Sequence, residues 1–419
     1  MKLFLSLTLL FCGGLLQAQT NPYLADLTAL KATLQNTASY KAQIKGDNAA
    51  HYEALYHRLA ADSLHPANSY SYFYNLSQLL FPLRDNHLGF YQLANYAHFT
   101  NKETVERFIQ TQEFLDYPKL EINIDSLKAV LAQKPADSIE GIYHYDKFYS
   151  VGLFKSGDKE YTGVIVDTDI NLWKKGQIAI HLYEYQPNLY KAIYGHPKTK
   201  NFILQPNEKY KNQSLVNSHF YASYSQKIYS KNLQPVDHVN LPRGGARFEL
   251  KSIDTDIQYL LVKSFQLNPA TVHQSNRFYD SIKNAITASN LILDLRNNEG
   301  GAKKATRNYY NLLKNFSKKG NVYILLNNET ISRAEIFTLQ LKRLKNVTTV
   351  GQTTKGMLSY GSNYGRRIKL PSGKFELYPT DMNGRSKLLP YEDVGIDPDI
   401  FLHNNANWID QVVEIIRRK

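Results

Sequence analysis

The spacing of apolar residues divides the chain into three stretches. Up to about residue 135, leucines and aromatic residues recur every three or four positions, as along residues 24–34, and this is the period of an amphipathic helix. From about 136 to 235, short β-prone runs are separated by turn sequences such as residues 156–159. The pattern predicts a helical N-terminal region at 19–135 and a β-rich module, a small barrel or sandwich, at 136–235.

The third stretch, residues 236–419, alternates strands with helices. Apolar runs such as 291–295 and 321–326 have the composition of buried parallel strands, and amphipathic helical segments separate them. A hairpin is expected at 368–377, where a Pro-Ser-Gly turn joins two β-prone runs. Such alternation is typical of a layered α/β core. We therefore predict a multidomain α/β (α+β) protein whose last segment forms the core.

The first 18 residues have the pattern of a secretory signal peptide. Lys2 precedes an apolar run that reaches Cys12, and small residues follow, with a plausible cleavage point after Ala18. We expect an exported protein, periplasmic or extracellular, whose mature form has no integral membrane segment. Lipidation of Cys12 is disfavoured because Phe11, and not a small residue, precedes it.

Composition narrows the chemistry further. The only cysteine lies in the predicted signal peptide, so the mature chain would have no disulfide, thiol nucleophile or cysteine-ligated metal. We predict no metal site and no cofactor. The excess of 50 Lys and Arg over 37 Asp and Glu is scattered and lacks a nucleic-acid motif, so nucleic acid is not an expected partner. Many of the 31 tyrosines fall in the β-rich module, where pleated packing is the simplest explanation and carbohydrate binding the alternative.

Two loops that follow predicted strands carry residues suited to catalysis. Residues 294–301 end in Gly300 and Gly301, and such a pair forms either a plain tight turn or a turn whose N–H groups hold an oxyanion. The Lys-Ser/Thr pair of a phosphate loop is missing after it. Ser332 stands where a helix begins, so the local field favours negative charge there, and Ser332 with Glu335 also fits a capping box.

Two more polar segments are weak signals on their own. His87 lies beside Asp85 and Asn86 and suits a general base, but most of the 12 histidines will be surface or core residues. Glu392 and Asp393 precede an Asp-Pro turn, and lone carboxylates at such a place are usually solvated.

In combination, these segments resemble the core of the tail-specific (C-terminal-processing) serine peptidases, and most closely their tricorn-like branch, which implies a ClpP/crotonase-like fold. The resemblance covers about residues 75–92 and 255–402. The matching motifs are Asp-x-His at 85–87, Asp-Leu-Arg-x-Asn-x-Gly-Gly at 294–301, Ser-x-x-Glu-Ile-Phe at 332–337 and Glu-x-x-Gly-Ile-x-Pro-Asp at 392–399. The substrate implied is a peptide or an unfolded protein.

The family has two catalytic designs. In the Ser–Lys design, the lysine position falls on Met357 here, and Lys355 lies two positions early, which shifts its tip along the strand. In the Ser–His–Glu design, His87 and Glu392 fill the matching positions. We therefore expect Ser332, His87 and Glu392 to act together, with Lys355 as the alternative base.

The resemblance also implies the roles. Ser332 would attack the carbonyl and form an acyl-enzyme, His87 would move the proton, and Glu392 would orient His87. Asn86 and Glu335 would support this arrangement.

The oxyanion hole would lie at Gly301, Gly300 and Arg333, with the N–H groups of Gly301 and Arg333 as donors and Gly300 shaping the turn. Arg333 stands where a small residue usually follows the nucleophile, so a catalytically inactive, peptide-binding member is an alternative. An acyl-CoA enzyme of the crotonase type shares the implied fold, but a secretion signal argues against a CoA ligand. The sequence indicates no oligomeric state.

Overall fold

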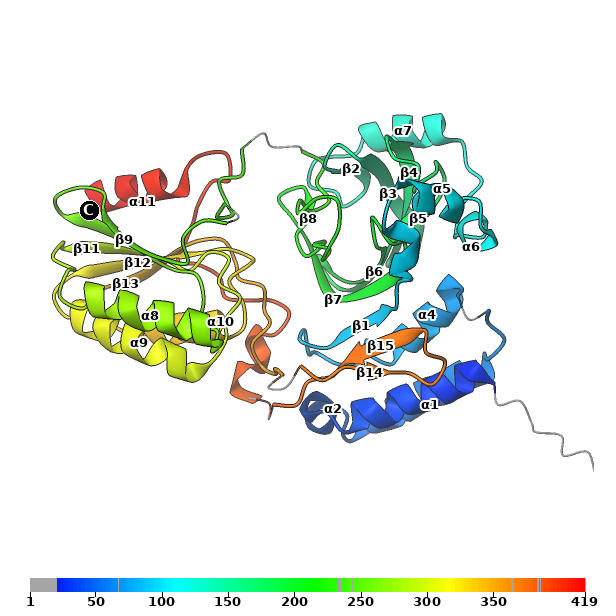
Figure 1. Cartoon of the computed structure of the whole chain (residues 1–419), viewed down its shortest axis with the longest axis horizontal. Helices are drawn as coiled ribbons and strands as arrows, with labels where there is room; N and C mark the ends of the chain where they lie inside the picture. The colour runs from blue at the N-terminus through cyan, green and yellow to red at the C-terminus, as the bar shows by residue number, and fades with distance from the viewer. Residues whose placement is uncertain are drawn as a thin grey trace, which may run out of the picture.

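The computed structural model describes residues 21–418, except residues 67, 233–235, 243, 363–364, 383 and 385. The predicted signal peptide, with Cys12, lies outside the described residues. Two β-sheets organise the chain, one of ten strands and one of six (Figure 1). No helix in the described part of the chain combines the length and the apolar character needed to cross a membrane.

Helices dominate the chain before residue 135. They are α1 (Pro22–Gln35), α2 (Ala38–Gln43), α3 (Asp47–Ala61), α4 (Tyr70–Gln78), the 3-10 turn η1 (Tyr96–Phe99), α5 (Lys102–Phe108), α6 (Gln112–Leu115) and α7 (Ile124–Ala132). In α1, Leu27, Leu30 and Leu34 are fully buried, so the three-to-four-residue spacing marks the face that packs. Asn21 caps this helix through its side chain, which accepts the N–H of Tyr23.

The ten-stranded sheet is antiparallel and follows the order β14-β15-β1-β7-β6-β5-β4-β3-β2, with β8 beside β7. Its strands are β1 (Gly89–Gln92), β2 (Gly141–Tyr145), β3 (Tyr149–Gly157), β4 (Glu160–Thr168), β5 (Ile178–Gln186), β6 (Leu189–Gly195), β7 (Phe202–Lys211), β8 (Ser214–Leu215), β14 (Ile368–Lys369) and β15 (Phe375–Tyr378). Ser230 forms bridges to both His144 in β2 and Ser214 in β8. These bridges close strands β2 to β8 into a barrel.

Three strands from outside residues 136–235 extend this sheet. β1 pairs with β7 on one side and with β15 on the other, and β14 pairs with β15. The strand that directly follows His87 is therefore fixed between the barrel and a hairpin from the C-terminal part of the chain.

The barrel interior explains much of the tyrosine content. Tyr143, Tyr145, Tyr190, Tyr194 and Tyr229 are each at most 2% exposed and belong to one continuous apolar cluster. These five side chains pack inside the protein, as the pleated-packing interpretation predicts, and offer no surface for a carbohydrate.

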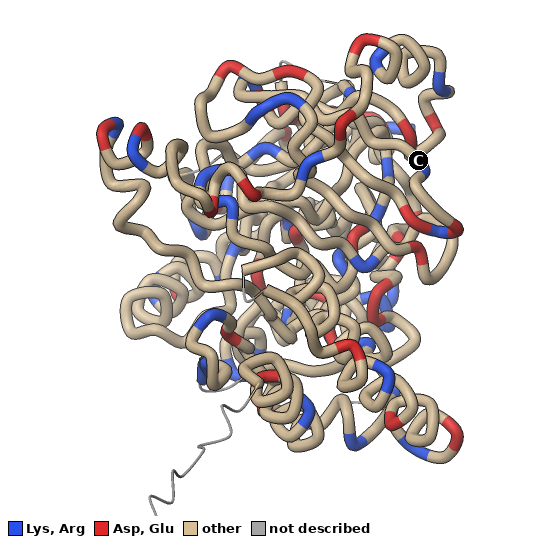
Figure 2. Tube along the Cα trace, turned by 90° about the vertical axis from the view of Figure 1, so that its right-hand side faces the viewer, with Lys and Arg blue, Asp and Glu red and all other residues tan. Residues whose placement is uncertain are grey.

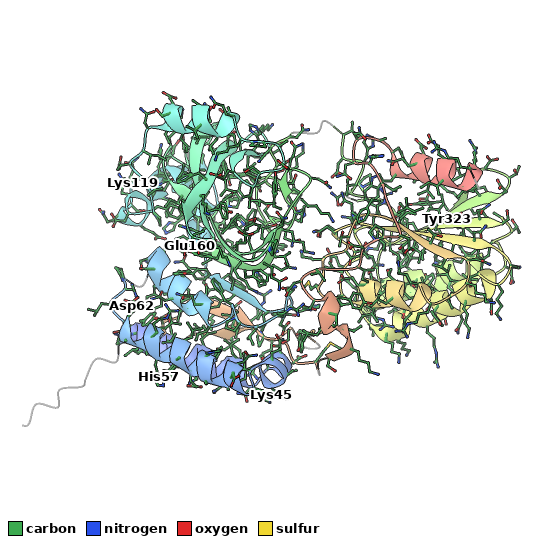
Figure 3. All side chains as sticks on the ribbon, turned by 180° about the vertical axis from the view of Figure 1, so that it is seen from behind. Lys45, His57, Asp62, Lys119, Glu160 and Tyr323 are labelled. Carbon is green, nitrogen blue, oxygen red and sulfur yellow. The ribbon has the colours of Figure 1, made fainter. Side chains whose placement is uncertain are left out.

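Charged residues of both signs are spread over the chain. Figure 3 labels Lys119 in the segment between α6 and α7, Glu160 at the start of β4 and Tyr323 in β12 (Asn321–Leu326) of the six-stranded sheet. Lys and Arg are interspersed with Asp and Glu along the trace (Figure 2), which agrees with the scattered charge of the sequence.

The six-stranded sheet forms the α/β core. Its order is β16-β13-β12-β11-β10-β9, parallel except for β9. Helices α8, α9 and α10 cover one face and α11 the other (Figure 1). The elements are β9 (Phe248–Ser252), β10 (Ile257–Val262), α8 (Pro269–Ile282), β11 (Asn290–Asp294), α9 (Lys303–Phe316), β12 (Asn321–Leu326), α10 (Arg333–Leu341), β13 (Val347–Gly351), the 3-10 turn η2 (Ser386–Tyr391), β16 (Ile400–Phe401) and α11 (Trp408–Arg417). The predicted α/β class is confirmed.

Candidate active site

The candidate site lies where three parallel strands end. β11, β12 and β13 run side by side, and the loops after them carry residues 295–302, 327–332 and 352–360. Ligands of open parallel sheets bind at this carboxyl edge because the loops there converge.

Ser332 occupies a strained turn at the start of α10. Its backbone has φ 57° and ψ −116°, a conformation that side-chain-bearing residues rarely adopt and that costs on the order of 1–3 kcal/mol. The turn is tight against Gly300, where an added Cβ would meet the Arg333 nitrogen at 2.7 Å. Gly300 itself has φ 80°, so the position needs glycine for both space and conformation.

His87 is brought to Ser332 from a remote part of the chain. The His87 Nε2 lies 3.2 Å from the Ser332 Oγ. Burial, reinforced by the positive charge of Lys355, lowers the pKa of His87 to about 4. The ring is therefore neutral near pH 7 and able to accept the hydroxyl proton.

Asp85 shapes the turn that presents His87. One of its carboxylate oxygens accepts the backbone N–H of His87 at 3.2 Å, and the other accepts the Thr380 hydroxyl at 2.6 Å. The Asp85 side chain is fully buried, and burial raises its pKa to about 6.

Glu392 supports this turn through the backbone. Its carboxylate accepts the N–H groups of Asn86 at 2.9 Å, Leu358 at 2.9 Å and Ser359 at 2.8 Å. These donors occupy both oxygens, and the Nδ1 of His87 makes no hydrogen bond to any described residue. Glu392 therefore contacts the backbone of Asn86, next to His87, and makes no hydrogen bond to the imidazole itself. Burial raises the pKa of Glu392 to about 8.

Asn86 and Asp393 tie the turn to the C-terminal loop. The Asn86 side chain donates to the carbonyl of Gly356 at 2.7 Å and to Asp393 at 2.9 Å. Arg84 forms an ion pair with Asp393 at 2.7 Å and also donates to the carbonyl of Glu392. Glu392 and Asp393 are at most 1% exposed, so the interpretation of them as solvated carboxylates is wrong: buried donors from remote segments satisfy them.

Glu335 is the second buried carboxylate of the site. It accepts the N–H of Ser332 at 2.8 Å, which is the glutamate half of the predicted capping box. It also accepts the Thr354 hydroxyl at 2.6 Å and the N–H groups of Gly356 and Met357 at 2.8 and 3.0 Å. Burial raises the pKa of Glu335, and this effect is larger than the lowering caused by the four donors.

Replacing Glu335 by Gln is expected to damage both stability and activity. A Gln amide group would direct N–H donors at backbone N–H groups that now have an acceptor. We expect the free energy of unfolding to fall by about 3 kcal/mol and kcat to fall by about 10²-fold, because the Ser332 turn moves. Chemical denaturation and peptide hydrolysis measure the two effects. Glu113→Gln, at an exposed position of α6, is the control and should change neither.

The glycine turn is built around Asn298. The Asn298 side chain accepts the N–H of Gly300 at 2.9 Å, and its carbonyl accepts the N–H of Ile331 at 3.0 Å. The N–H of Gly300 is thus engaged within the turn. The bridge between Phe265 and Gly301 uses the N–H groups of Phe265 and Ala302, and not that of Gly301.

The Arg333 side chain does not crowd the nucleophile. Its guanidinium donates to Thr306 in α9 at 3.1 Å and to Gln340 at 3.3 Å, and the residue is 5% exposed. The bulk of this side chain is thus directed to α9, so it offers no steric argument for an inactive protein.

Lys355 follows β13 and makes no hydrogen bond to Ser332 among the described residues. Its ammonium donates no hydrogen bond to any described residue, whereas its charge acts on His87 and Glu329. Burial favours the neutral form of Glu329, but the charge of Lys355 and the contact with His219 (3.4 Å from Nε2 to Oε1) outweigh it and lower the pKa of Glu329 to about 2. The sequence offered no signal for His219 or Glu329, because their partners are distant in the chain.

One protein-family model matches part of the chain. Residues 302–401 match the model of "Peptidase family S41". No curated protein sequence matches the chain significantly. Similar solved structures include mature CPAF (12% identity, TM-score 0.42, covering 94% of this chain and 96% of that one). The photosystem II D1 C-terminal processing protease has 14% identity and a TM-score of 0.36, with 94% and 97% covered.

A putative peptidase from Parabacteroides merdae is also similar (13% identity, TM-score 0.37, covering 94% and 96%). TM-scores of this size carry no conclusion about activity, so the match of residues 302–401 to the family model is the finding that bears on the resemblance. The resemblance of this chain to the tail-specific peptidases, drawn from its motifs, is confirmed by its match to peptidase family S41 over residues 302–401.

Proposed function

We propose that this protein is an exported serine peptidase that cleaves peptides or unfolded proteins. The observation that carries the proposal is the 3.2 Å contact between the hydroxyl of Ser332, on a strained turn, and a neutral buried imidazole. A hydroxyl is a weak nucleophile, and an adjacent base within hydrogen-bond reach activates it. Export rests on residues 1–18 of the sequence.

In the proposed reaction, the Ser332 oxygen attacks the scissile carbonyl while His87 takes the hydroxyl proton. The N–H groups of Gly301 and Arg333 hold the oxyanion, and His87 returns the proton to the leaving amine. Water then hydrolyses the acyl-enzyme. Asp85 and Glu392 keep the His87 turn in place, and Glu335 does the same for the Ser332 turn.

The alternative base, Lys355, is less well supported. A catalytic lysine needs close contact with its serine, and here the imidazole of His87 has that contact. An inactive peptide-binding protein is the second alternative. Hydrolysis of casein by the purified mature protein, and its loss on treatment with a fluorophosphonate, supports the peptidase, and intact casein after long incubation at high enzyme concentration contradicts it.

The pH dependence of kcat/KM separates the two bases. His87 must be neutral to accept a proton, so kcat/KM should fall as the pH drops through the pKa of His87 in the enzyme without substrate. That pKa is about 4, well below that of an ordinary histidine. Lys355→Met removes a charge that lowers this pKa, so the acidic limb should move to higher pH while activity persists. A limb in the alkaline range, abolished in Lys355→Met, would identify Lys355 as the base. Circular dichroism at each pH controls for unfolding.

A further inference from the structure

Strand β7 of the barrel presents three polar side chains at alternate positions to the loops of the site. Asn207 donates to the carbonyl of Asp393 at 2.9 Å and to that of Lys355 at 3.3 Å. Lys211 donates to the Thr353 hydroxyl. Since side chains two residues apart share a face of a strand, these residues and Lys209 between them form one contact with the loops.

Lys209 makes more hydrogen bonds to the loops than Asn207 or Lys211 does. Its ammonium donates to three carbonyl oxygens, those of Lys355 at 2.8 Å, Val394 at 3.2 Å and Thr354 at 3.4 Å. An ammonium has three donors, so this set uses all of them. The residue is 7% exposed, and these hydrogen bonds compensate a desolvation that is otherwise costly.

The two segments held by Lys209 are those that engage the buried carboxylates. Thr354, Gly356 and Met357 donate to Glu335, which holds the Ser332 turn. Val394 follows Glu392 and Asp393, which hold the His87 turn. One buried ammonium thus lies between the two halves of the site and is bonded to both.

We propose that Lys209 is a positioning residue, which fixes the 354–357 and 392–394 segments relative to each other and so sets the distance between Ser332 and His87. The catalytic part of this inference rests on the proposed function. Lys209 touches no reacting atom and acts only through these backbone segments. The barrel thereby takes part in forming the site.

The test compares Lys209→Met with Lys200→Met. Lys200 is also a buried barrel lysine, 3% exposed, but it donates to Leu172 and Gln177 and lies over Trp173, away from the site. We expect Lys209→Met to lower kcat by about 10²-fold with little change in KM, because misplaced catalytic groups slow the chemical step. Lys200→Met should lose stability while each folded molecule keeps its kcat.

Hydrogen–deuterium exchange gives a readout that does not depend on activity. In Lys209→Met, the amides of residues 356–359 should exchange faster because they donate to Glu335 and Glu392, whereas Lys200→Met should leave them protected. Unchanged exchange there in Lys209→Met, or equal kcat losses in the two variants, would overturn the inference. Lys209→Gln, which keeps two donors, takes the place of Lys209→Met should the latter not fold. An inactive wild-type protein would reject the proposed function and leave the exchange result to decide the positioning claim.

Discussion

Ser332→Ala is expected to lower peptide hydrolysis by about 10⁶-fold, the size of loss that removal of a serine nucleophile causes in peptidases. The variant should fold, because the Glu335 carboxylate accepts the backbone N–H of residue 332 and not its side chain. The strained conformation of the turn is also unchanged, since alanine and serine share the same backbone restrictions.

Casein hydrolysis by the two purified proteins measures this effect. Ser275→Ala is a matched control, because it removes a partly buried hydroxyl that contacts Tyr309 in α9, away from the site. Equal activity of Ser332→Ala and the wild type would reject Ser332 as the nucleophile, whereas a loss shared by the control would point to a general effect on folding.

His87→Ala is expected to lower kcat by about 10⁴-fold, because a positioned general base contributes up to that factor. Lys355→Met should keep kcat within about tenfold of the wild type, since the hydroxyl contacts an imidazole and hydrogen-bonds to no lysine in the described part of the chain. The comparison is informative because both positions lie in the same site, and the structure gives the hydrogen bond to Ser332 to His87.

Kinetics of casein or peptide hydrolysis near pH 7 distinguish the two variants. The reverse result, with His87→Ala fully active and Lys355→Met inactive, would replace the proposed base by the alternative one. If both variants fold but lose activity, the proposal that His87 acts as the base without Lys355 is also contradicted.

Local patterns in the sequence predicted much of the α/β core and part of the site. The apolar runs at 291–295 and 321–326 became β11 and β12, because buried parallel strands need continuous apolar residues. Ser332 and Glu335 are three residues apart, so their contact is a local property of a helix start.

The contact between Ser332 and His87 joins residues 245 positions apart. No periodicity of the chain specifies it, and only the combination of motifs pointed to it.

The features that the sequence did not predict depend on contacts between residues that are far apart in the chain. β1 lies between β7 and β15, strands that are far from it in the chain, and no local periodicity specifies that neighbourhood. The donors that satisfy Glu392 are backbone N–H groups of three different residues, which carry no side-chain signature. Lys209 and Asn207 looked like ordinary polar strand residues for the same reason: their acceptors are carbonyl groups of remote loops.

Covalent labelling tests whether Ser332 is an activated nucleophile. The purified protein is treated with a serine-reactive fluorophosphonate at neutral pH, digested, and mapped by mass spectrometry. We expect a single adduct on Ser332, absent from Ser332→Ala and formed much more slowly in His87→Ala. An adduct on another residue, or no adduct on a folded protein that hydrolyses casein, would contradict that role of Ser332.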